Sequence, residues 1–175
     1  LATRLLAEAA FQRGLPVIGS ETHGMSQRGG SVTSHVRIGG YASPMVAPAS
    51  ADIMIALEAG EAYRHLQFLR PGRPGRPGGT LFVNAEASFP VSQVRELLAG
   101  SGIACHVVDA TRRAQALGAV LVSNLITLGF ASADDRFPFS LEELTEVVKR
   151  LSPARYQELN VRALAEGWQG RSAGE

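Results

Sequence analysis

Short apolar runs that alternate with helical segments are the feature that most limits what this chain can fold into. The run at 51–57 has the length of a strand and only one charged residue, and a segment with helical spacing follows at 61–69. Further strands are expected at 80–83 and 106–108, with a helix over 92–99 between them. Apolar strands of this kind belong to parallel sheets covered on both faces. The pattern predicts βαβ units in an α/β fold, a three-layer α/β/α sandwich with a mostly parallel sheet.

The N-terminal part combines a helix with two short strands. Apolar residues four apart predict a helix from Leu1 to Gly14, a residue type that commonly ends helices. Residues 15–18 predict a short buried strand, and the alternation over 31–38 predicts a second one. The first helix begins without a capping residue, so we expect an N-terminal piece to be missing from this sequence.

Helices follow the last predicted strand and should form a C-terminal helical flank. Asp109 is a suitable N-cap for a long helix that ends at Gly129. Ser140 and Glu143 have the spacing of a capping box. Ser152-Pro153 is a typical start for the final helix. The flank is a candidate surface for a partner subunit.

Length and charge exclude several classes of protein. The chain has 175 residues, which predicts a single domain over 1–175. Seventeen basic and 16 acidic residues leave no surplus for binding nucleic acid or an anionic membrane. No apolar run is long enough to span a bilayer. The single cysteine, Cys105, excludes an internal disulfide, a four-cysteine zinc site and a self-contained iron–sulfur cluster, and we expect a cytoplasmic location.

A threefold Arg-Pro-Gly repeat occupies residues 70–79, between a predicted helix and a predicted strand. Proline forbids helix there and glycine adds flexibility, so the simplest interpretation is a lengthened surface loop. The alternative is a basic, extended arm that contacts a partner or nucleic acid. Three arginines without interleaved aromatic residues favour the surface loop.

The segment at 20–32 gathers polar groups suited to ligand binding. The glycines at 29–30 let backbone N–H groups approach a ligand, and Arg28 can bind a phosphate or carboxylate through two hydrogen bonds. The alternative is a tight turn whose arginine binds neighbouring carbonyls. The segment matches neither the Walker A nor the GxGxxG pattern.

Single polar residues elsewhere are mostly assigned structural roles. His35 alternates with apolar residues and is expected to be packed, whereas His65 is expected on the polar side of its helix. Cys105 is interpreted as a small buried apolar residue beside His106. Asn124 lies on an apolar stripe, where its amide must bond either a loop backbone or a ligand.

The residues at 21–39, ETHGMSQRGGSVTSHVRIG, closely resemble a signature of the 2-oxoacid:ferredoxin oxidoreductase γ family. The QRGGSV form with a preceding HGM resembles its indolepyruvate-type branch, the smaller (β) subunit. ADIMIALEAGEA at 51–62, PGGTLFVN at 77–84 and the N-x-x-x-L-G pattern at 124–129 agree in order. Members of this family open with a strand and a G-x-G-G-Q-G turn that are not in this sequence, and their P-G-G is shorter than the repeat at 70–79.

The resemblance implies a subunit of an enzyme that oxidatively decarboxylates a 2-oxoacid, forms an acyl-CoA and passes electrons to ferredoxin. Thiamine diphosphate, Mg and 4Fe-4S clusters are then expected in a large (α) partner subunit, with coenzyme A as co-substrate and none of these cofactors bound by this chain alone. An aryl 2-oxoacid such as indolepyruvate is the leading substrate class, and a homodimer is a further expectation. Neither nucleic acid nor a membrane is expected as a partner.

The resemblance also suggests which residues contact ligand in the active cleft. They are the polar and glycine residues of the signature together with one helical amide: His23, Gly24, Gln27, Arg28, Gly29, Gly30 and Asn124. No catalytic residue and no metal ligand is assigned to the chain. The alternatives are a γ subunit for pyruvate, 2-oxoglutarate or a branched-chain 2-oxoacid, a free-standing nucleotide- or CoA-binding module, and a scaffolding domain without ligand.

Overall fold

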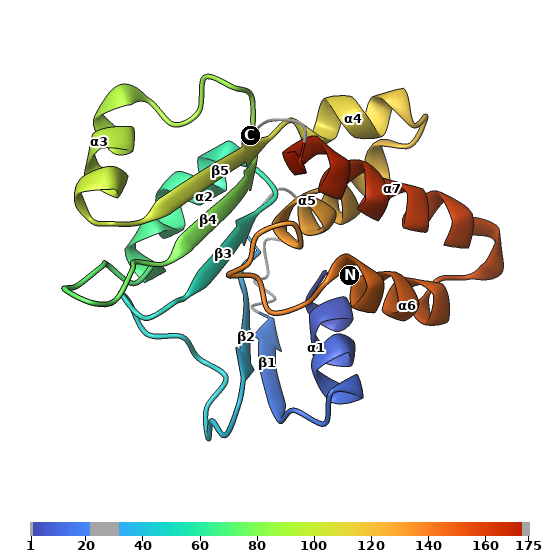
Figure 1. Cartoon of the computed structure of the whole chain (residues 1–175), viewed down its shortest axis with the longest axis horizontal. Helices are drawn as coiled ribbons and strands as arrows, with labels where there is room; N and C mark the ends of the chain where they lie inside the picture. Colours follow the sequence, from blue (N-terminus) through green and yellow to red (C-terminus); the bar gives the residue numbers. More distant parts are fainter. Residues whose placement is uncertain (1, 22–31, 173–175) are drawn as a thin grey trace.

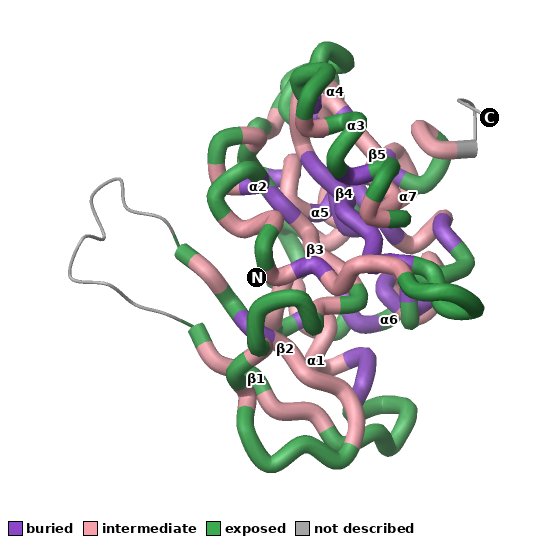
Figure 2. Tube along the Cα trace, turned by 90° about the vertical axis from the view of Figure 1, so that its left-hand side faces the viewer, coloured by how far each residue is buried: buried purple, intermediate pink, exposed green. Residues whose placement is uncertain are grey.

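The computed structural model describes residues 2–21 and 32–172, and a parallel sheet lies at its centre (Figure 1). The strands β3 (Ile53–Ala56), β4 (Thr80–Asn84) and β5 (Ala104–Val108) lie in the order β3-β4-β5. Both neighbouring pairs are parallel. The central strand β4 is buried over its first four residues, in agreement with its continuous apolar sequence (Figure 2). The predicted parallel sheet is confirmed.

Helices cover both faces of this sheet (Figure 1). Alternate side chains of β4 enter two separate cores: Leu81 and Val83 pack with residues of α2, and Phe82 packs with residues of α5. The predicted α/β/α layering and C-terminal helical flank are confirmed. The helical elements are α1 (Ala2–Gln12), α2 (Ala59–His65), η1 (Leu66–Phe68), α3 (Ser92–Gly100), α4 (Ala110–Ala116), η2 (Val120–Val122), α5 (Ser123–Ala131), α6 (Leu141–Leu151) and α7 (Ala154–Ser172).

The first two strands form a separate antiparallel pair. β1 (Val17–Glu21) pairs with β2 (Ser34–Ile38), and Glu21 lies opposite Ser34. The prediction of a buried strand at 15–18 was wrong in its bounds and in its burial. The strand β1 begins and ends later, and its residues are exposed or only partly buried. An antiparallel pair can leave one face in water, so its strands need no continuous apolar run.

The long helix expected between Asp109 and Gly129 is two helices. Asp109 caps α4 as predicted, because its carboxylate accepts a hydrogen bond of 2.9 Å from the Arg112 N–H. The helix then ends, and Gly118 adopts a left-handed conformation with φ of 78°, which favours glycine. The chain resumes as η2 and α5, and Gly129 lies inside α5 rather than at its end. The predicted stop at Gly129 was therefore wrong.

Gly129 is needed for a close crossing of α5 and α7. A Cβ atom on Gly129 would overlap the Leu164 carbonyl of α7, and one on Gly167 would overlap the Ile126 carbonyl of α5. The two glycines thus let the backbones approach more closely than side chains would allow. This crossing packs the last helix, α7, against α5, which in turn covers one face of the sheet.

A group of charged side chains fastens the last turn of α7 to the sheet. Asp134 Oδ2 accepts a hydrogen bond of 2.6 Å from Arg171 and lies 3.3 Å from His106 Nε2 on β5. Asp134 Oδ1 accepts a hydrogen bond of 2.9 Å from the Arg136 N–H. Burial raises the pKa of Asp134, but the Arg136 N–H and the charges of Arg171, Arg136 and His106 outweigh burial and lower the pKa overall.

The capping box of α6 also connects to α1. Ser140 accepts from the Glu143 N–H, and the Glu143 carboxylate accepts from the Ser140 N–H, as predicted. Glu143 also accepts hydrogen bonds from both Nε and Nη2 of Arg13, just beyond the end of α1. The Arg13 guanidinium lowers the pKa of Glu143.

The RPG turn, residues 70–79, is a closed turn rather than an extended arm. Arg73 and Arg76 pair through backbone hydrogen bonds of 2.9 Å in both directions. The turn leads into β4, and it occupies the residues for which a lengthened surface loop was predicted.

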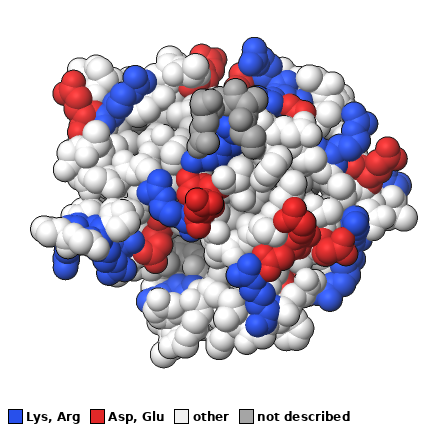
Figure 3. Space-filling view, viewed as in Figure 1, with Lys and Arg blue, Asp and Glu red and all other residues white. Residues whose placement is uncertain are grey.

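Charges are mixed over the face seen in Figure 3, where basic and acidic side chains alternate. This agrees with the nearly balanced composition. Among the helices that the structure describes, none has the length and hydrophobicity that a bilayer crossing requires.

Candidate functional site

Most of the predicted ligand-binding residues lie outside the described part of the chain. They are His23, Gly24, Gln27, Arg28, Gly29 and Gly30. The flanks of their segment are described: β1 ends at Glu21, and β2 begins at Ser34 directly opposite it. The QRGG segment therefore connects the two paired strand ends of an antiparallel hairpin. The described part of the candidate site consists of those flanks and of the elements that contact them.

His35 on β2 is a packing residue, as predicted. It is buried, and its Nδ1 accepts a hydrogen bond of 3.0 Å from the Val46 N–H. Its ring meets the Phe68 ring edge-on at a centroid distance of 5.6 Å. These contacts join β2 to the 3₁₀ helix η1 and hold the second flank of the QRGG segment against the body of the domain.

His65 brings α2 to the same flank. Its Nε2 lies 3.3 Å from Thr33 Oγ1 and 3.6 Å from Glu61 Oε2. His65 was expected on the polar side of its helix, but its side chain is partly buried against the Phe68 ring. The Thr33–His65 contact could not be predicted, because 32 residues separate the two and no local pattern links them.

Asn124 lies at the beginning of α5, because the long predicted helix is broken before it. Its side chain is half-buried, and its Oδ1 accepts a hydrogen bond of 2.8 Å from the Leu125 N–H. The amide thus satisfies a donor in the first turn of its own helix, where N–H groups lack intrahelical partners. The predicted structural bond exists, although it is to the helix itself rather than to a loop. Its contact with ligand stays a prediction.

Asn84 is the central polar residue at the carboxyl edge of the sheet, and sequence analysis assigned it no role. Its Nδ2 donates to the Leu57 carbonyl at 3.1 Å and to Thr111 Oγ1 at 2.9 Å. Its Oδ1 accepts from the Ala110 and Thr111 N–H groups at 2.9 and 3.2 Å. One side chain therefore joins the end of β4 to the end of β3 and to the start of α4. The feature of the sequence that could have indicated this role is a polar residue, Asn84, at the end of an apolar strand.

A pocket of about 330 Å³ opens beside Asn84, beyond the carboxyl ends of β4 and β5. Ligands of open α/β sheets generally bind at this edge. Its charged groups are paired: Arg113 binds Glu166 at 2.6 Å, and Arg112 lies 3.4 Å from Asp109. The pocket lining comprises Ala85, Ala87, Val107, Val108, Asp109, Arg112, Arg113, Phe130 and Gly170.

The residues of this chain do not fit an iron–sulfur cluster. A cluster needs several thiolates, and Cys105 is the single cysteine. Burial raises the pKa of its thiol, which keeps it protonated at neutral pH. The side chain is half-buried on β5, less enclosed than predicted. Within residues 2–21 and 32–172 no three His, Cys, Asp or Glu side chains are grouped so that they could hold a metal ion.

Comparison with known proteins places the chain among oxidoreductase subunits. The pyruvate ferredoxin/flavodoxin oxidoreductase family matches residues 1–170. Indolepyruvate oxidoreductase subunit IorB of Archaeoglobus fulgidus is 33% identical over 170 residues, which cover 94% of this chain and 85% of the relative. The same subunit of Thermococcus kodakarensis is 32% identical over 183 residues, which cover 95% of this chain and 86% of the relative.

Solved structures share the fold. The γ subunit of a keto/oxoacid ferredoxin oxidoreductase from Geobacter sulfurreducens superposes with a TM-score of 0.70 at 22% identity, covering 99% of this chain and 90% of that one. Subunit PORC of pyruvate oxidoreductase from Thermotoga maritima superposes with a TM-score of 0.69 at 24% identity, covering 97% of this chain and 87% of that one. With the family match over nearly the whole sequence, the resemblance seen in the signature is confirmed, and the chain belongs to the pyruvate ferredoxin/flavodoxin oxidoreductase family.

Proposed function

We propose that this chain is the γ-type subunit of a 2-oxoacid:ferredoxin oxidoreductase that oxidatively decarboxylates an aryl 2-oxoacid such as indolepyruvate to an acyl-CoA. The observation that carries the proposal is the 33% identity with subunit IorB of Archaeoglobus fulgidus over 94% of the chain. The HGM-SQRGGSV signature, which resembles the indolepyruvate-type branch, supports the same substrate class.

The chain contributes to this reaction as one part of a complex. One cysteine cannot ligate a 4Fe-4S cluster, so we assign the clusters, together with thiamine diphosphate and Mg, to a large (α) companion subunit. Those groups supply the decarboxylation and electron-transfer chemistry when bound there. Ferredoxin then receives the electrons through the complex. A homodimer of the chain and a cytoplasmic location belong to the same proposal.

The role proposed for the QRGG segment is to hold an anionic group of the substrate or of coenzyme A. Arg28 can donate two parallel hydrogen bonds to a carboxylate or phosphate, and the amides of Gly29 and Gly30 can donate to the same group. His23, Gly24, Gln27 and Asn124 complete the proposed binding set. The His35 and His65 contacts support the arrangement, because they fix the flank from which the segment extends.

Coexpression with the companion large subunit tests the proposal. The purified complex should reduce methyl viologen when given indolepyruvate and coenzyme A, and faster than with pyruvate, 2-oxoglutarate or a branched-chain 2-oxoacid. Faster reduction with one of those three would move the substrate to the alternative class. A chain that stays monomeric beside the companion and binds coenzyme A or a nucleotide alone would instead be a free-standing binding module.

Arg28→Ala tests the role of the QRGG segment. Loss of a charge-assisted, two-point contact costs about 1.5–3 kcal/mol, so the KM for the 2-oxoacid or for coenzyme A should rise roughly tenfold or more. Arg4→Ala, an exposed position on α1, is the matched control and should leave both constants unchanged. Unchanged steady-state constants in Arg28→Ala would remove the residue from the site.

A further inference from the structure

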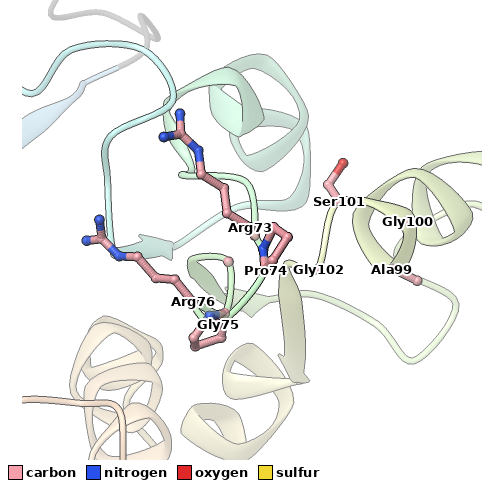
Figure 4. Close-up of a pocket in the computed structure, with 11 residues that line it drawn as sticks. Arg73, Pro74, Gly75, Arg76, Ala99, Gly100, Ser101 and Gly102 are labelled. Carbon is pink, nitrogen blue, oxygen red and sulfur yellow. The ribbon is translucent and has the colours of Figure 1, made fainter.

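The RPG turn presents two arginines side by side. Arg73 and Arg76 are joined by backbone hydrogen bonds in both directions, with Pro74 and Gly75 as the connecting residues and Gly75 at φ of 77°. Residues paired in this way face each other with Cα atoms about 5.5 Å apart, and their side chains leave the same face. Figure 4 shows both side chains extending to one side of the turn, away from α3.

The base of the turn is fixed to the loop that follows α3. Gly72 N–H donates to the Ser101 carbonyl at 2.7 Å, and Gly78 N–H donates to the Gly102 carbonyl at 3.0 Å. A Cβ atom on Gly78 would overlap that carbonyl, so the close approach requires glycine. A shallow depression of about 480 Å³ lies between the turn and residues 99–102. The backbone that carries the two arginines is therefore fixed to the domain.

Positive charge exceeds negative charge in this region. Asp52 binds Arg70 at 2.8 Å and lies 3.8 Å from Arg76, so one carboxylate meets two guanidinium groups, with Arg73 beside them. Arg73 and Arg76 are both exposed. Like charges placed opposite each other on paired strands repel, and an anion bound between them removes that cost. Basic side chains gather on the projection at the left edge of Figure 3, where Figure 1 shows the loop leading into β4.

The position of the turn separates it from the pocket at the carboxyl edge of the sheet. The turn precedes β4, and the loop at 101–102 precedes β5, so both lie at the amino end of the parallel strands. Asn84 and the 330 Å³ pocket lie at the opposite, carboxyl end. An anion bound at the turn therefore lies outside the 330 Å³ pocket.

We propose that the RPG turn is a docking point for an acidic segment of a protein partner. Pockets for small ligands bury most of the ligand surface, whereas this depression is shallow and both guanidinium groups stand in solvent. The residues that line it include no aromatic side chain on which a nucleic-acid base could stack. Adjacent carboxylates of a Glu- or Asp-rich segment match the two guanidinium groups in charge, and each can accept two hydrogen bonds from one guanidinium group.

The test measures binding of fluorescein-labelled hexaglutamate to the full chain by fluorescence anisotropy at low ionic strength. Replacing both residues, as Arg73→Gln with Arg76→Gln, should weaken binding about tenfold, the sum expected for two exposed ion pairs. The variant with Arg73→Lys and Arg76→Lys keeps both charges and should bind nearly as well as the parent. The matched control, Arg155→Gln with Arg162→Gln, removes two exposed charges from α7 on the other side of the molecule (Figure 1).

Three results would overturn the proposal. The first is absence of hexaglutamate binding by the parent chain. The second is an equal loss in the variant with Arg155→Gln and Arg162→Gln, which would mean that net charge alone attracts the peptide. The third is tighter binding of a thymidine hexanucleotide that is lost in the double Gln variant, since the turn would then be a nucleic-acid site. Circular dichroism should give equal melting temperatures for all variants, so that a change in binding reports the side chains at 73 and 76 rather than a loss of the fold.

Discussion

Asn84 and Asn124 both accept hydrogen bonds from N–H groups at the start of a helix, but Asn84 also joins separate elements of the fold. Asn124 bonds the next residue of its own helix. Asn84 bonds groups on β3 and on α4 while belonging to β4. Asn84 therefore fixes the relative positions of three elements at the carboxyl edge, where the pocket opens. At the scale of single residues, the geometry of this edge depends on one amide.

Asn84→Ala should destabilise the domain by about 2 kcal/mol, because it removes the bond to the Leu57 carbonyl and leaves two N–H groups of α4 without their acceptor. Urea unfolding followed by circular dichroism measures the change. Asn160→Ala is the control: its amide donates one hydrogen bond of 2.9 Å to Ser152 Oγ, so its loss should cost about 1 kcal/mol or less. Equal effects of the two substitutions would contradict the bridging role.

At the scale of elements, the close crossing of α5 and α7 is the most demanding contact in the helical layer. Two glycines permit it, one on each helix, and each faces a backbone carbonyl of the other helix rather than a side chain. Backbone atoms cannot move aside as a flexible side chain can. A methyl group at either position must therefore separate the helices and loosen the core that includes Ile126 and Leu164.

Gly167→Ala should lower the free energy of unfolding by about 2–3 kcal/mol, even though alanine favours helix more than glycine does. Gly60→Ala provides the opposite case, because a Cβ atom on Gly60 in α2 would meet nothing within 4 Å. That substitution should leave stability unchanged or raise it by up to about 1 kcal/mol. Chemical denaturation of both variants tests the crossing. An unchanged free energy of unfolding in Gly167→Ala would show that the two helices are not in tight contact.

The elements that the sequence predicted well are those with a local cause. Apolar strands, the Asp109 cap and the Ser140–Glu143 capping box depend on residues a few positions apart, and all are present. The break at Gly118 was missed because apolar spacing continues across it, while Gly129, taken for a helix end, is required by packing against α7. Tertiary contact decided that position, and no pattern within the helix reveals it.

The candidate site divides in the same way. Its polar signature is visible in the sequence as one continuous segment, and alternation predicted the strand that follows it, whereas the strand before it was predicted with the wrong bounds and burial. The contact of Thr33 with His65, and the bridging by Asn84, join residues about 30 positions apart. Such contacts follow from the order of strands and helices in space. They become predictable only after the layers of the fold are known.

At the scale of the whole molecule, the group around Asp134 connects the sheet, the loop before α6 and the last turn of α7. Arg171 binds the carboxylate and lies above the Phe82 and Phe130 rings, at 5.8 and 5.3 Å from their centroids. Side-chain exposure is 6% for Asp134 and 13% for Arg171, so the pair is shielded from water. A shielded guanidinium that loses its carboxylate is costly, and the cost falls on the docking of α7.

Because the pKa of Asp134 is lowered in the folded state, its ionised form stabilises the fold above the unfolded pKa of about 3.9, and this stabilisation is lost as pH falls through the folded pKa. Asp134→Asn should therefore lower the free energy of unfolding by about 3 kcal/mol at neutral pH. The gap between parent and variant should hold down to about pH 5 and shrink below about pH 4, as the parent carboxylate becomes protonated. Urea unfolding at a series of pH values measures it. Asp135→Asn, at the neighbouring exposed position, should show no such gap. A difference between parent and Asp134→Asn that stays constant into strong acid would mean that the loss of stability has a cause other than the charge of Asp134, and that this charge does not fasten the helix.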